Sequence, residues 1–261
     1  MSRKRSTKSR VLRNRPDNTL ELSTALINNY KAWEEGPKKK SWSLHDIKPL
    51  KPLTQTQEEF FHSYYNDRNI VGHGSPGTGK SYISLWLALC DVLDKSKPQD
   101  RVIIVRSNVA TRDVGHLPGT VEEKLAPFEA PYRDILEGLF GRASTYTDMK
   151  ASGLVEFMPT SFIRGQTWDN AIVIIDEIQS LNSHEISSVI SRLGIDSRLI
   201  AIGDVKQDDL IYKKNDTSGF ASALRAFQLM KSVDVIQFTQ EDIVRSGICR
   251  EWIIACEAVG I

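Results

Sequence analysis

The sequence predicts an α/β fold in which a doubly wound, mostly parallel sheet carries helices on both faces. Short runs of β-branched and other apolar residues alternate with longer stretches of helical periodicity, which is the order expected when each strand is followed by a crossover helix. Most of the short runs are continuously apolar rather than alternating, as expected of parallel strands that are covered on both sides. Ligands of such sheets bind at the carboxyl ends of the strands, so functional residues are expected there.

Six segments are expected to form the strands. They are residues 69–72, 102–105, 154–158, 172–175, 199–202 and 233–238. Residues 82–93 are apolar nearly all round, which predicts a helix packed under the sheet. In residues 184–193 apolar positions recur at i, i+3, i+4 and i+7, which predicts an amphipathic helix. Trp86 and Trp252 occur in apolar helical sequence, so both are expected in the core rather than as platforms for base stacking.

Composition limits the class of protein. The chain has 261 residues, of which 40% are hydrophobic and 26% charged, in the ordinary range of globular proteins. Its three cysteines form no C-x-x-C pair and its five histidines show no metal-ligand spacing, so neither a disulfide scaffold nor a transition-metal site is expected. The longest apolar stretch has eight residues, whereas a membrane span needs about 20. We therefore expect a cytoplasmic protein without membrane attachment.

Charged residues are distributed unevenly along the chain. Residues 1–51 have a net charge of +8, and residues 52–261 have a net charge of −7. We expect residues 1–19 to be a disordered basic arm, residues 20–50 to form a helix and a linker, and residues 51–261 to form the compact domain. Such an arm can neutralise phosphates of RNA or DNA, or it can be a solvated arm that only aids solubility. The sequence leaves both alternatives open.

The strongest motif follows the first expected strand. It is a complete G-x-x-x-x-G-K-[ST] phosphate loop, in which inward-turned backbone N–H groups and the start of the next helix hold phosphate oxygens. Lys80 adds a positive charge at the β- and γ-phosphates, and Ser81 offers a hydroxyl to Mg²⁺. The expected nucleotide-binding residues are Gly74, Ser75, Pro76, Gly77, Thr78, Gly79, Lys80, Ser81 and Tyr82.

Two acidic residues follow the buried segment 172–175. Asp176 is expected to hold Mg²⁺, through water, and Glu177 to orient and deprotonate the attacking water. This pair favours hydrolysis of a nucleoside triphosphate over simple nucleotide storage. A third strand ends in Gly203 and Asp204, and Gln207 nearby, together with Gln179, is placed to sense whether the γ-phosphate is present.

The order of these motifs resembles the first motor domain of superfamily 1 helicases and, more specifically, the PhoH family of ATP-binding proteins, which includes phage-encoded members. The similar stretches begin with Gln57 and the phosphate loop. They continue with Gly115-His116-Leu117-Pro118-Gly119, Lys124, Pro127, Arg164-Gly165-Gln166-Thr167, Asp176-Glu177-Ile178-Gln179, Ser191-Arg192-Leu193-Gly194, Gly203-Asp204-Val205-Lys206-Gln207 and Asp242-Ile243-Val244-Arg245. The resemblance runs from about Lys51 to the C-terminus. It departs from the family pattern at Arg106-Ser107 and His116, in the segment expected to face substrate.

The resemblance implies a RecA-like P-loop NTPase that uses ATP and Mg²⁺, with helicase-like or RNA-processing roles and a family name taken from phosphate starvation. By similarity, Gln57 contacts adenine, and Gln179 and Gln207 report the γ-phosphate. Arg245 is the candidate arginine finger, although a surface salt bridge or a helix cap is an alternative role. For a phage-encoded member the location would be the host cytoplasm.

Three functions remain open. The first is an ATPase that remodels RNA or single-stranded DNA, with Arg106, Arg112 and Arg164 lining the nucleic-acid path. The second is a nucleotide-dependent switch with little turnover, acting through protein partners, and the third is a small-molecule kinase. Because the chain lacks the length for a second motor domain, a neighbouring subunit would complete the site in a homo-oligomer, expected to be a hexameric ring.

Overall fold

The computed structural model describes residues 42–107, 120–204 and 219–259. The expected basic arm, residues 20–41 of the segment expected to form a helix and a linker, Arg112, His116 and Gln207 lie outside these ranges. Among the described residues, no helix combines the length and the hydropathy that crossing a membrane requires.

Six parallel strands form one sheet. They are β1 (Asn69–Gly74), β2 (Arg101–Arg106), β3 (Val155–Pro159), β4 (Ala171–Ile175), β5 (Arg198–Gly203) and β6 (Val233–Phe238). Their order across the sheet is β3-β2-β4-β5-β1-β6. All six expected strands are therefore confirmed, and β5 lies between the strand before the phosphate loop and the strand before the acidic pair.

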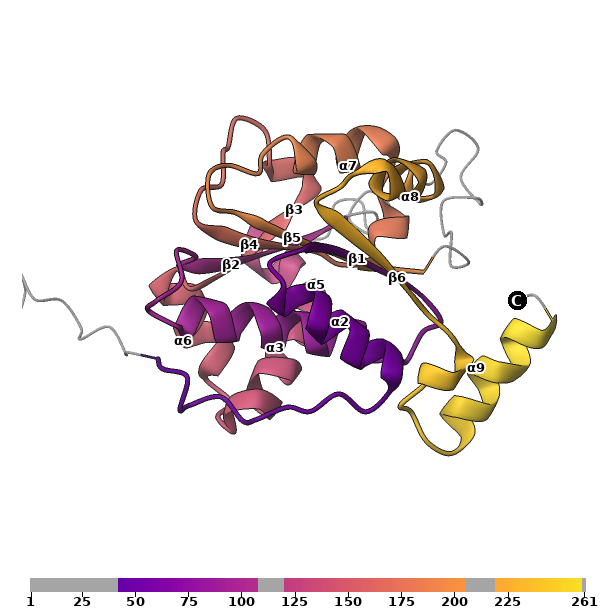
Figure 1. The fold of residues 1–261 in the computed structure, drawn as a ribbon. Helices are drawn as coiled ribbons and strands as arrows, with labels where there is room; N and C mark the ends of the chain where they lie inside the picture. The colour runs from indigo at the N-terminus through magenta and orange to yellow at the C-terminus, as the bar shows by residue number, and fades with distance from the viewer. Residues whose placement is uncertain (1–41, 108–119, 205–218, 260–261) are drawn as a thin grey trace, which may run out of the picture. The chain divides into compact units, whose positions relative to one another are not determined.

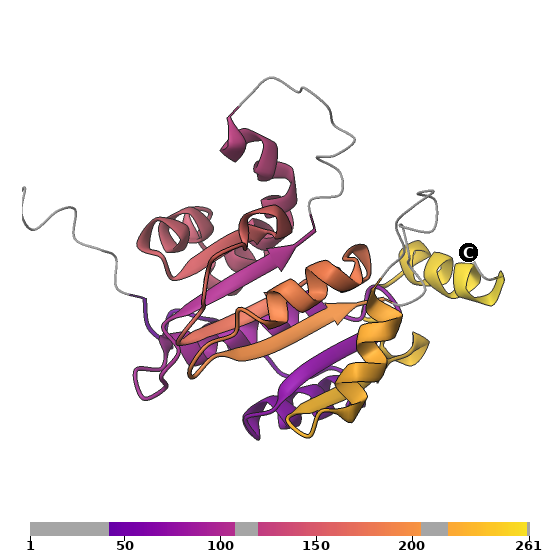
Figure 2. The ribbon, with the colours of Figure 1, turned by 90° about the horizontal axis from the view of Figure 1, so that it is seen from above.

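Helices cover both faces of this sheet (Figures 1 and 2). On one face lie α2 (Gln55–Tyr65), α3 (Lys80–Leu93), α5 (Val121–Phe140) and α6 (Thr145–Ser152). On the other lie α7 (Ser183–Ile190) and α8 (Phe220–Leu229). Short 3₁₀ turns occur at η1 (Thr160–Phe162), η2 (Ile178–Ser180) and η3 (Gln240–Asp242). The doubly wound α/β fold is confirmed.

Strand side chains alternate between two apolar cores, one on each face of the sheet. Ile70 and Ile104 pack in the core under α2, α3, α5 and α6, whereas their neighbours Val71 and Ile103 pack in the core under α7 and α8. All four are fully buried. Because both faces are covered, the strands are apolar without alternation, which is the pattern that predicted them.

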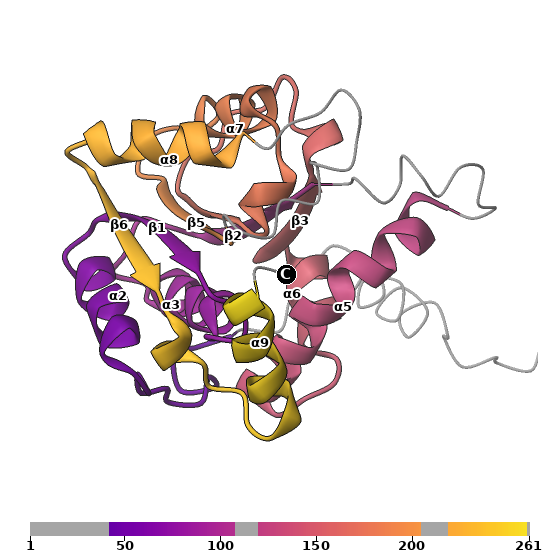
Figure 3. The same ribbon diagram turned by 90° about the vertical axis from the view of Figure 1, so that its right-hand side faces the viewer.

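The C-terminal helix α9 (Ile248–Val259) lies beyond the carboxyl end of β6, apart from the helices on the two faces (Figures 1 and 3). None of its residues is buried, and Trp252 is 68% exposed. The expectation that Trp252 belongs to the core is therefore wrong. Trp86, in contrast, is buried on α3 and donates its indole N–H to the Lys48 carbonyl at 2.8 Å, as expected of a core tryptophan.

The chain that enters α2 is packed against the domain. Trp42 and Ile47 are buried, and the rings of Trp42 and Phe140 meet edge-on with centroids 5.3 Å apart. The Lys48 N–H donates to the Leu139 carbonyl at 2.9 Å. Residues 42–50, which the sequence assigned to a linker, thus contribute to the core beside α5.

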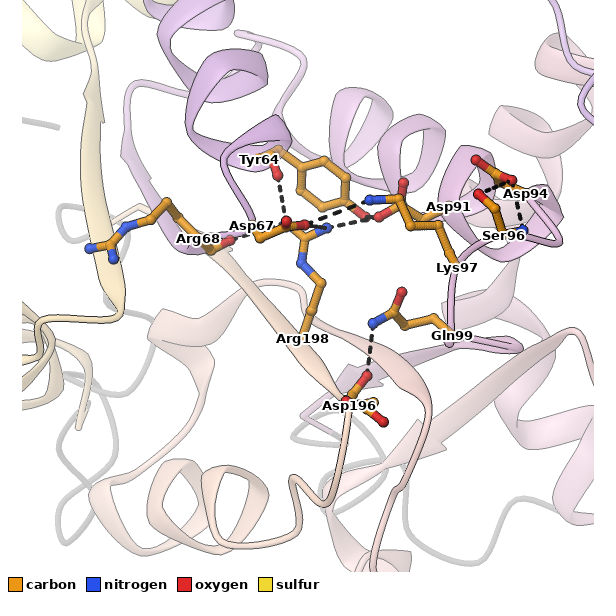
Figure 4. Close-up of polar contacts among 10 residues, drawn as sticks. All are labelled: Tyr64, Asp67, Arg68, Asp91, Asp94, Ser96, Lys97, Gln99, Asp196 and Arg198. Carbon is orange, nitrogen blue, oxygen red and sulfur yellow. Dashed lines mark hydrogen bonds and ion pairs between the residues drawn. The ribbon is translucent and has the colours of Figure 1, made fainter.

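A buried polar cluster joins α2, α3 and β5 at the amino end of the sheet, opposite the phosphate loop (Figure 4). The Arg198 guanidinium donates to the Asp91 carboxylate at 2.8 Å and to the Tyr64 carbonyl at 2.6 Å, and it lies 3.9 Å from the centre of the Tyr64 ring. The Tyr64 hydroxyl donates to the same Asp91 oxygen at 3.0 Å. Burial raises the pKa of Tyr64 well above its usual value, which keeps the hydroxyl a donor.

Asp91→Ala should lower the free energy of unfolding by about 3–5 kcal/mol, because it removes the carboxylate that pairs with the buried guanidinium and accepts from the buried phenol. Urea titration followed by circular dichroism measures this change. The matched control is Asp100→Ala, whose carboxylate is 62% exposed and pairs with Arg101 at 3.0 Å. Its expected effect is about 0–1 kcal/mol. Equal effects of the two substitutions would contradict a structural role for the buried pair.

Candidate nucleotide-binding site

The phosphate loop connects the end of β1 to the start of α3. Gly74 has φ +117°, and a Cβ there would lie 2.0 Å from the Phe238 carbonyl oxygen, so a side chain is excluded both by conformation and by space. Gly79 caps α3 in the left-handed region with φ +81°. At these two positions the backbone conformation of the loop therefore favours glycine.

The Lys80 ammonium lies inside this loop. It donates to the carbonyls of Gly74 at 2.8 Å and Ser75 at 2.7 Å, and to the Thr78 hydroxyl at 3.2 Å. Burial lowers its pKa, and the nearby carboxylates, Asp204 first and then Glu177, oppose that shift. A positive charge is thus held among backbone groups at the N-terminus of a helix, which is an environment suited to phosphate.

The Asp176 carboxylate is fixed on both of its oxygens. Oδ1 accepts from the Ser81 hydroxyl at 3.1 Å and from the Glu177 N–H at 3.1 Å, and Oδ2 accepts from the Tyr132 hydroxyl at 2.8 Å. Only 6% of Asp176 is exposed. Its pKa is raised mainly by burial and next by the adjacent charge of Glu177. A buried carboxylate of this kind is stabilised by a cation.

Ser81 and Asp176 fit a magnesium site. They supply two hard oxygen donors in contact, one of them a buried acid, and Mg²⁺ is commonly held by one or two carboxylates together with substrate phosphates and water. Within the part of the chain that the structure describes, no group of three or more His, Cys, Asp or Glu side chains is arranged to hold a metal by itself. This donor set therefore matches an ion that arrives with a phosphate ligand.

Glu177 follows Asp176 in a backbone conformation that is unusual for a residue with a side chain. Its backbone is left-handed, with φ 54° and ψ 47°, a conformation that costs a non-glycine residue about 1–3 kcal/mol. Its Oε2 accepts from the Gln179 side-chain amide at 2.5 Å, and the Gln179 Oε1 accepts from the Asp204 N–H at 3.1 Å. Gln179 thus connects the ends of β4 and β5. A Cβ at Gly203 would lie 2.2 Å from the Gln179 Oε1, so a side chain there would displace the Gln179 amide.

Gln57 connects the chain before α2 to the phosphate loop. Its Oε1 accepts from the Leu53 N–H at 2.8 Å, and its Nε2 donates to the Thr78 carbonyl at 2.9 Å. The residue is 2% exposed and lies on α2, whose first turn is capped by the Thr54 hydroxyl. Contact with adenine stays a prediction for Gln57, while its contact with the phosphate loop is an observed one.

Arg245 lies beside the phosphate loop of its own chain. The preceding residue, Val244, donates its N–H to the Gly77 carbonyl at 3.1 Å, and a Cβ at Gly77 would lie 3.0 Å from the Arg245 Cγ. Its side chain is exposed, and it lines the same cavity as the loop. The fold therefore brings Arg245 to the site without a second subunit.

These residues surround one cavity of about 790 Å³ at the carboxyl ends of the strands. Its lining includes the expected residues Gln57, Pro76, Gly77, Thr78, Gly79, Lys80, Ser81, Tyr82, Asp176, Glu177 and Arg245. Gly74 and Ser75 lie at the start of the loop, and Gln179 lies buried behind Glu177. Gln207 falls outside the described residues.

Tyr132, Asp204 and Arg106 also line the cavity. Arg106 was expected to contact nucleic acid, and Asp204 belongs to the quoted Gly-Asp motif, but neither was expected in the nucleotide site. Tyr132 was missed entirely. It occurs in a helical segment where an apolar or aromatic residue is ordinary, so no local pattern distinguishes it from a core tyrosine.

A phosphate loop after one parallel strand and an acid pair after another define the class of the P-loop nucleoside triphosphatases. Residues 49–257 match the family described as PhoH-like protein, and the chain belongs to the PhoH family, as the sequence motifs indicated. It is 32% identical to Protein PhoH of Escherichia coli strain K12 over 207 residues, which is 78% of this chain and 57% of that protein.

Other relatives agree with this assignment. The chain is 32% identical to the PhoH-like protein of Bacillus subtilis strain 168 over 199 residues, covering 76% of this chain and 61% of that one. The chain thus spans little more than half the length of these relatives. Among solved structures, the Pif1 helicase from Candida albicans aligns with a TM-score of 0.36 and 18% identity, covering 73% of this chain and 40% of that one.

Proposed function

We propose that this protein is an ATPase that couples hydrolysis to the remodelling of RNA or single-stranded nucleic acid. The observation that carries the proposal is the 3.1 Å contact between Ser81 of the phosphate loop and Asp176 of the acid pair. The contact joins the phosphate loop and the acid pair at one cavity, although their strands are separated by β5. Simple nucleotide storage does not require the second half.

Binding uses the loop and the acid that faces it. Lys80 would exchange its loop carbonyls for the β- and γ-phosphates of ATP, and Ser81 and Asp176 would hold Mg²⁺. When bound, Mg²⁺ neutralises charge that develops on the phosphates. Gln57 closes the base end of the site, where it already contacts the phosphate loop.

Hydrolysis uses Glu177, Gln179 and Arg245. Glu177 accepts the proton of the attacking water, since it lines the cavity and its carboxylate is held by the Gln179 amide. Gln179 holds that carboxylate and senses the γ-phosphate through the backbone of Asp204. Arg245 stabilises the transferred phosphoryl charge from its own chain, because it already lies beside the loop.

Nucleic acid is proposed to lie along the carboxyl ends of β2 and β3. Phe162, in the turn after β3, is 51% exposed, and Arg164 two residues later is exposed as well. An exposed aromatic ring beside a cation is the combination that stacks bases and tracks a phosphate backbone. Arg106 ends β2 and lines the nucleotide cavity, so it is placed to connect the two ligands.

We extend the proposal to a homo-oligomer, expected as a hexameric ring. Helix α9 exposes Ile248 (84%) and Trp252 (68%), and a cluster of large exposed apolar side chains commonly marks a protein contact. The helix lies beside the phosphate loop, where the Ile253 side chain would approach within 3.1 Å of a Cβ at Gly77. A neighbouring subunit on α9 would therefore border the nucleotide site.

The test is steady-state phosphate release with Mg²⁺ and ATP, alone and with single-stranded RNA or DNA. We expect nucleic acid to stimulate turnover and Arg164→Ala to reduce that stimulation while leaving basal turnover unchanged. Arg225→Ala removes an exposed arginine from α8, which packs beside β6 at the edge of the sheet opposite β3. It is the matched control and should behave as the wild type. ATP binding without any stimulation by either nucleic acid would contradict remodelling and favour the nucleotide-dependent switch.

A further inference from the structure

Tyr132 is buried in the middle of α5, on the side that faces the sheet. It is 1% exposed, and its ring lies 5.8 Å from that of Phe157 on β3, measured between centroids. Its hydroxyl donates to the Asp176 Oδ2 at 2.8 Å. Helix α5 is thereby joined to the strand end that holds the acid pair, although α5 contributes no part of either nucleotide motif.

The carboxylate of Asp176 has a defined orientation because each oxygen has its own partner. Ser81 and the Glu177 N–H contact Oδ1, so this is the oxygen that faces the phosphate loop. Tyr132 contacts the other oxygen. Removal of the Tyr132 hydroxyl would leave Oδ2 without this donor in a site that is 6% exposed, and only the two bonds to Oδ1 would then restrain rotation about the χ2 bond.

We infer that Tyr132 is a positioning residue for the metal site, holding Asp176 so that one oxygen stays directed to Ser81 and the phosphate loop. The inference rests on the proposed ATP and Mg²⁺ chemistry of the same cavity. Hydrogen bonds to a metal-binding carboxylate set its orientation, and losing one commonly reduces metal affinity about 10–100-fold. Binding of Mg²⁺ with nucleotide then requires that α5 pack in the position that brings the Tyr132 hydroxyl to Asp176.

A purely structural role is the competing explanation, and Tyr64 provides a matched control for it. Tyr64 is also 1% exposed, and its hydroxyl donates to a buried aspartate, Asp91, at 3.0 Å. That pair lies at the amino end of the sheet (Figure 4), away from the cavity. Tyr132→Phe and Tyr64→Phe each remove one hydroxyl that donates to a buried aspartate. Both should therefore lower stability, whereas only Tyr132→Phe should weaken metal binding.

The experiment measures Mn²⁺ binding to the full chain with ADP by electron paramagnetic resonance, and ADP affinity with EDTA by fluorescence. We expect Tyr132→Phe to weaken Mn²⁺ binding about 10–100-fold while leaving ADP affinity in EDTA unchanged. Tyr64→Phe should bind Mn²⁺ as the wild type does. In an Asp176→Asn background, Tyr132→Phe should cause no further loss, because its effect is transmitted through Asp176.

Wild-type Mn²⁺ affinity in Tyr132→Phe would overturn the inference, and thermal melting lower than that of Tyr64→Phe would then assign the hydroxyl to stability. A Tyr132→Phe chain that fails to fold, when Tyr64→Phe folds, would assign it to stability as well. A wild-type chain that binds no ADP would instead contradict the proposed function. The two failures are therefore distinguishable in the same set of measurements.

Discussion

Lys80→Ala should abolish tight ATP binding and reduce turnover by about 10²–10³-fold or more. The ammonium lies among the loop oxygens at 2.7–3.2 Å, where it supplies the positive charge for the phosphates. Alanine removes that charge and leaves the Gly74 and Ser75 carbonyls facing the nucleotide. Fluorescence titration with a labelled ATP analogue and a phosphate-release assay measure the two effects.

The control for this substitution is Lys95→Ala. Lys95 is exposed just past the other end of α3, so the change alters net charge equally but not the loop. Its nucleotide affinity and turnover should equal those of the wild type. Wild-type affinity in Lys80→Ala would show that the nucleotide does not occupy the phosphate loop.

Glu177→Gln should retain ATP binding and lose turnover by about 10²–10⁴-fold, the usual contribution of a general base. The amide keeps the size of the carboxylate and an oxygen that accepts from Gln179, so the site keeps its shape. It cannot accept the proton of the attacking water. Single-turnover hydrolysis, with ATP affinity measured on the same preparation, separates the chemical step from binding.

Glu137→Gln on α5 is the matched control, because it makes the same chemical change at an exposed position outside the cavity lining. It should hydrolyse ATP at the wild-type rate. Undiminished turnover in Glu177→Gln would show that another group accepts the proton of the attacking water. Glu177 would then have no assigned role in hydrolysis beside the metal-binding role of Asp176.

The strands were predictable because a parallel strand that is buried on both faces is a continuous run of apolar residues. The helices between them were predictable from apolar residues at helical spacing. The segment 233–238 coincides with β6, and the others differ by one or two residues at their ends. Trp252 shows the limit of the same argument. Helical apolar periodicity marks a face that avoids water, but it does not say whether the chain itself covers that face.

The candidate site likewise contains residues that the sequence predicts and residues that it does not. The phosphate loop, Asp176 and Glu177 were predictable, because each depends on a local motif at the end of a strand and parallel strands end at one edge. Tyr132 depends on the docking of α5, 44 residues before Asp176 in the chain, and no spacing rule connects the two. The contact between Gln57 and Thr78 likewise becomes visible only when α2 is in place.

The most direct test of the central claim, that the phosphate loop and the acid pair form one hydrolytic site, is to measure ATP affinity and Mg²⁺-dependent hydrolysis side by side in three proteins. We predict that the wild type binds and hydrolyses ATP, that Glu177→Gln binds without hydrolysing, and that Lys80→Ala does neither. A wild type that binds ATP but turns it over no faster than Glu177→Gln would contradict the claim.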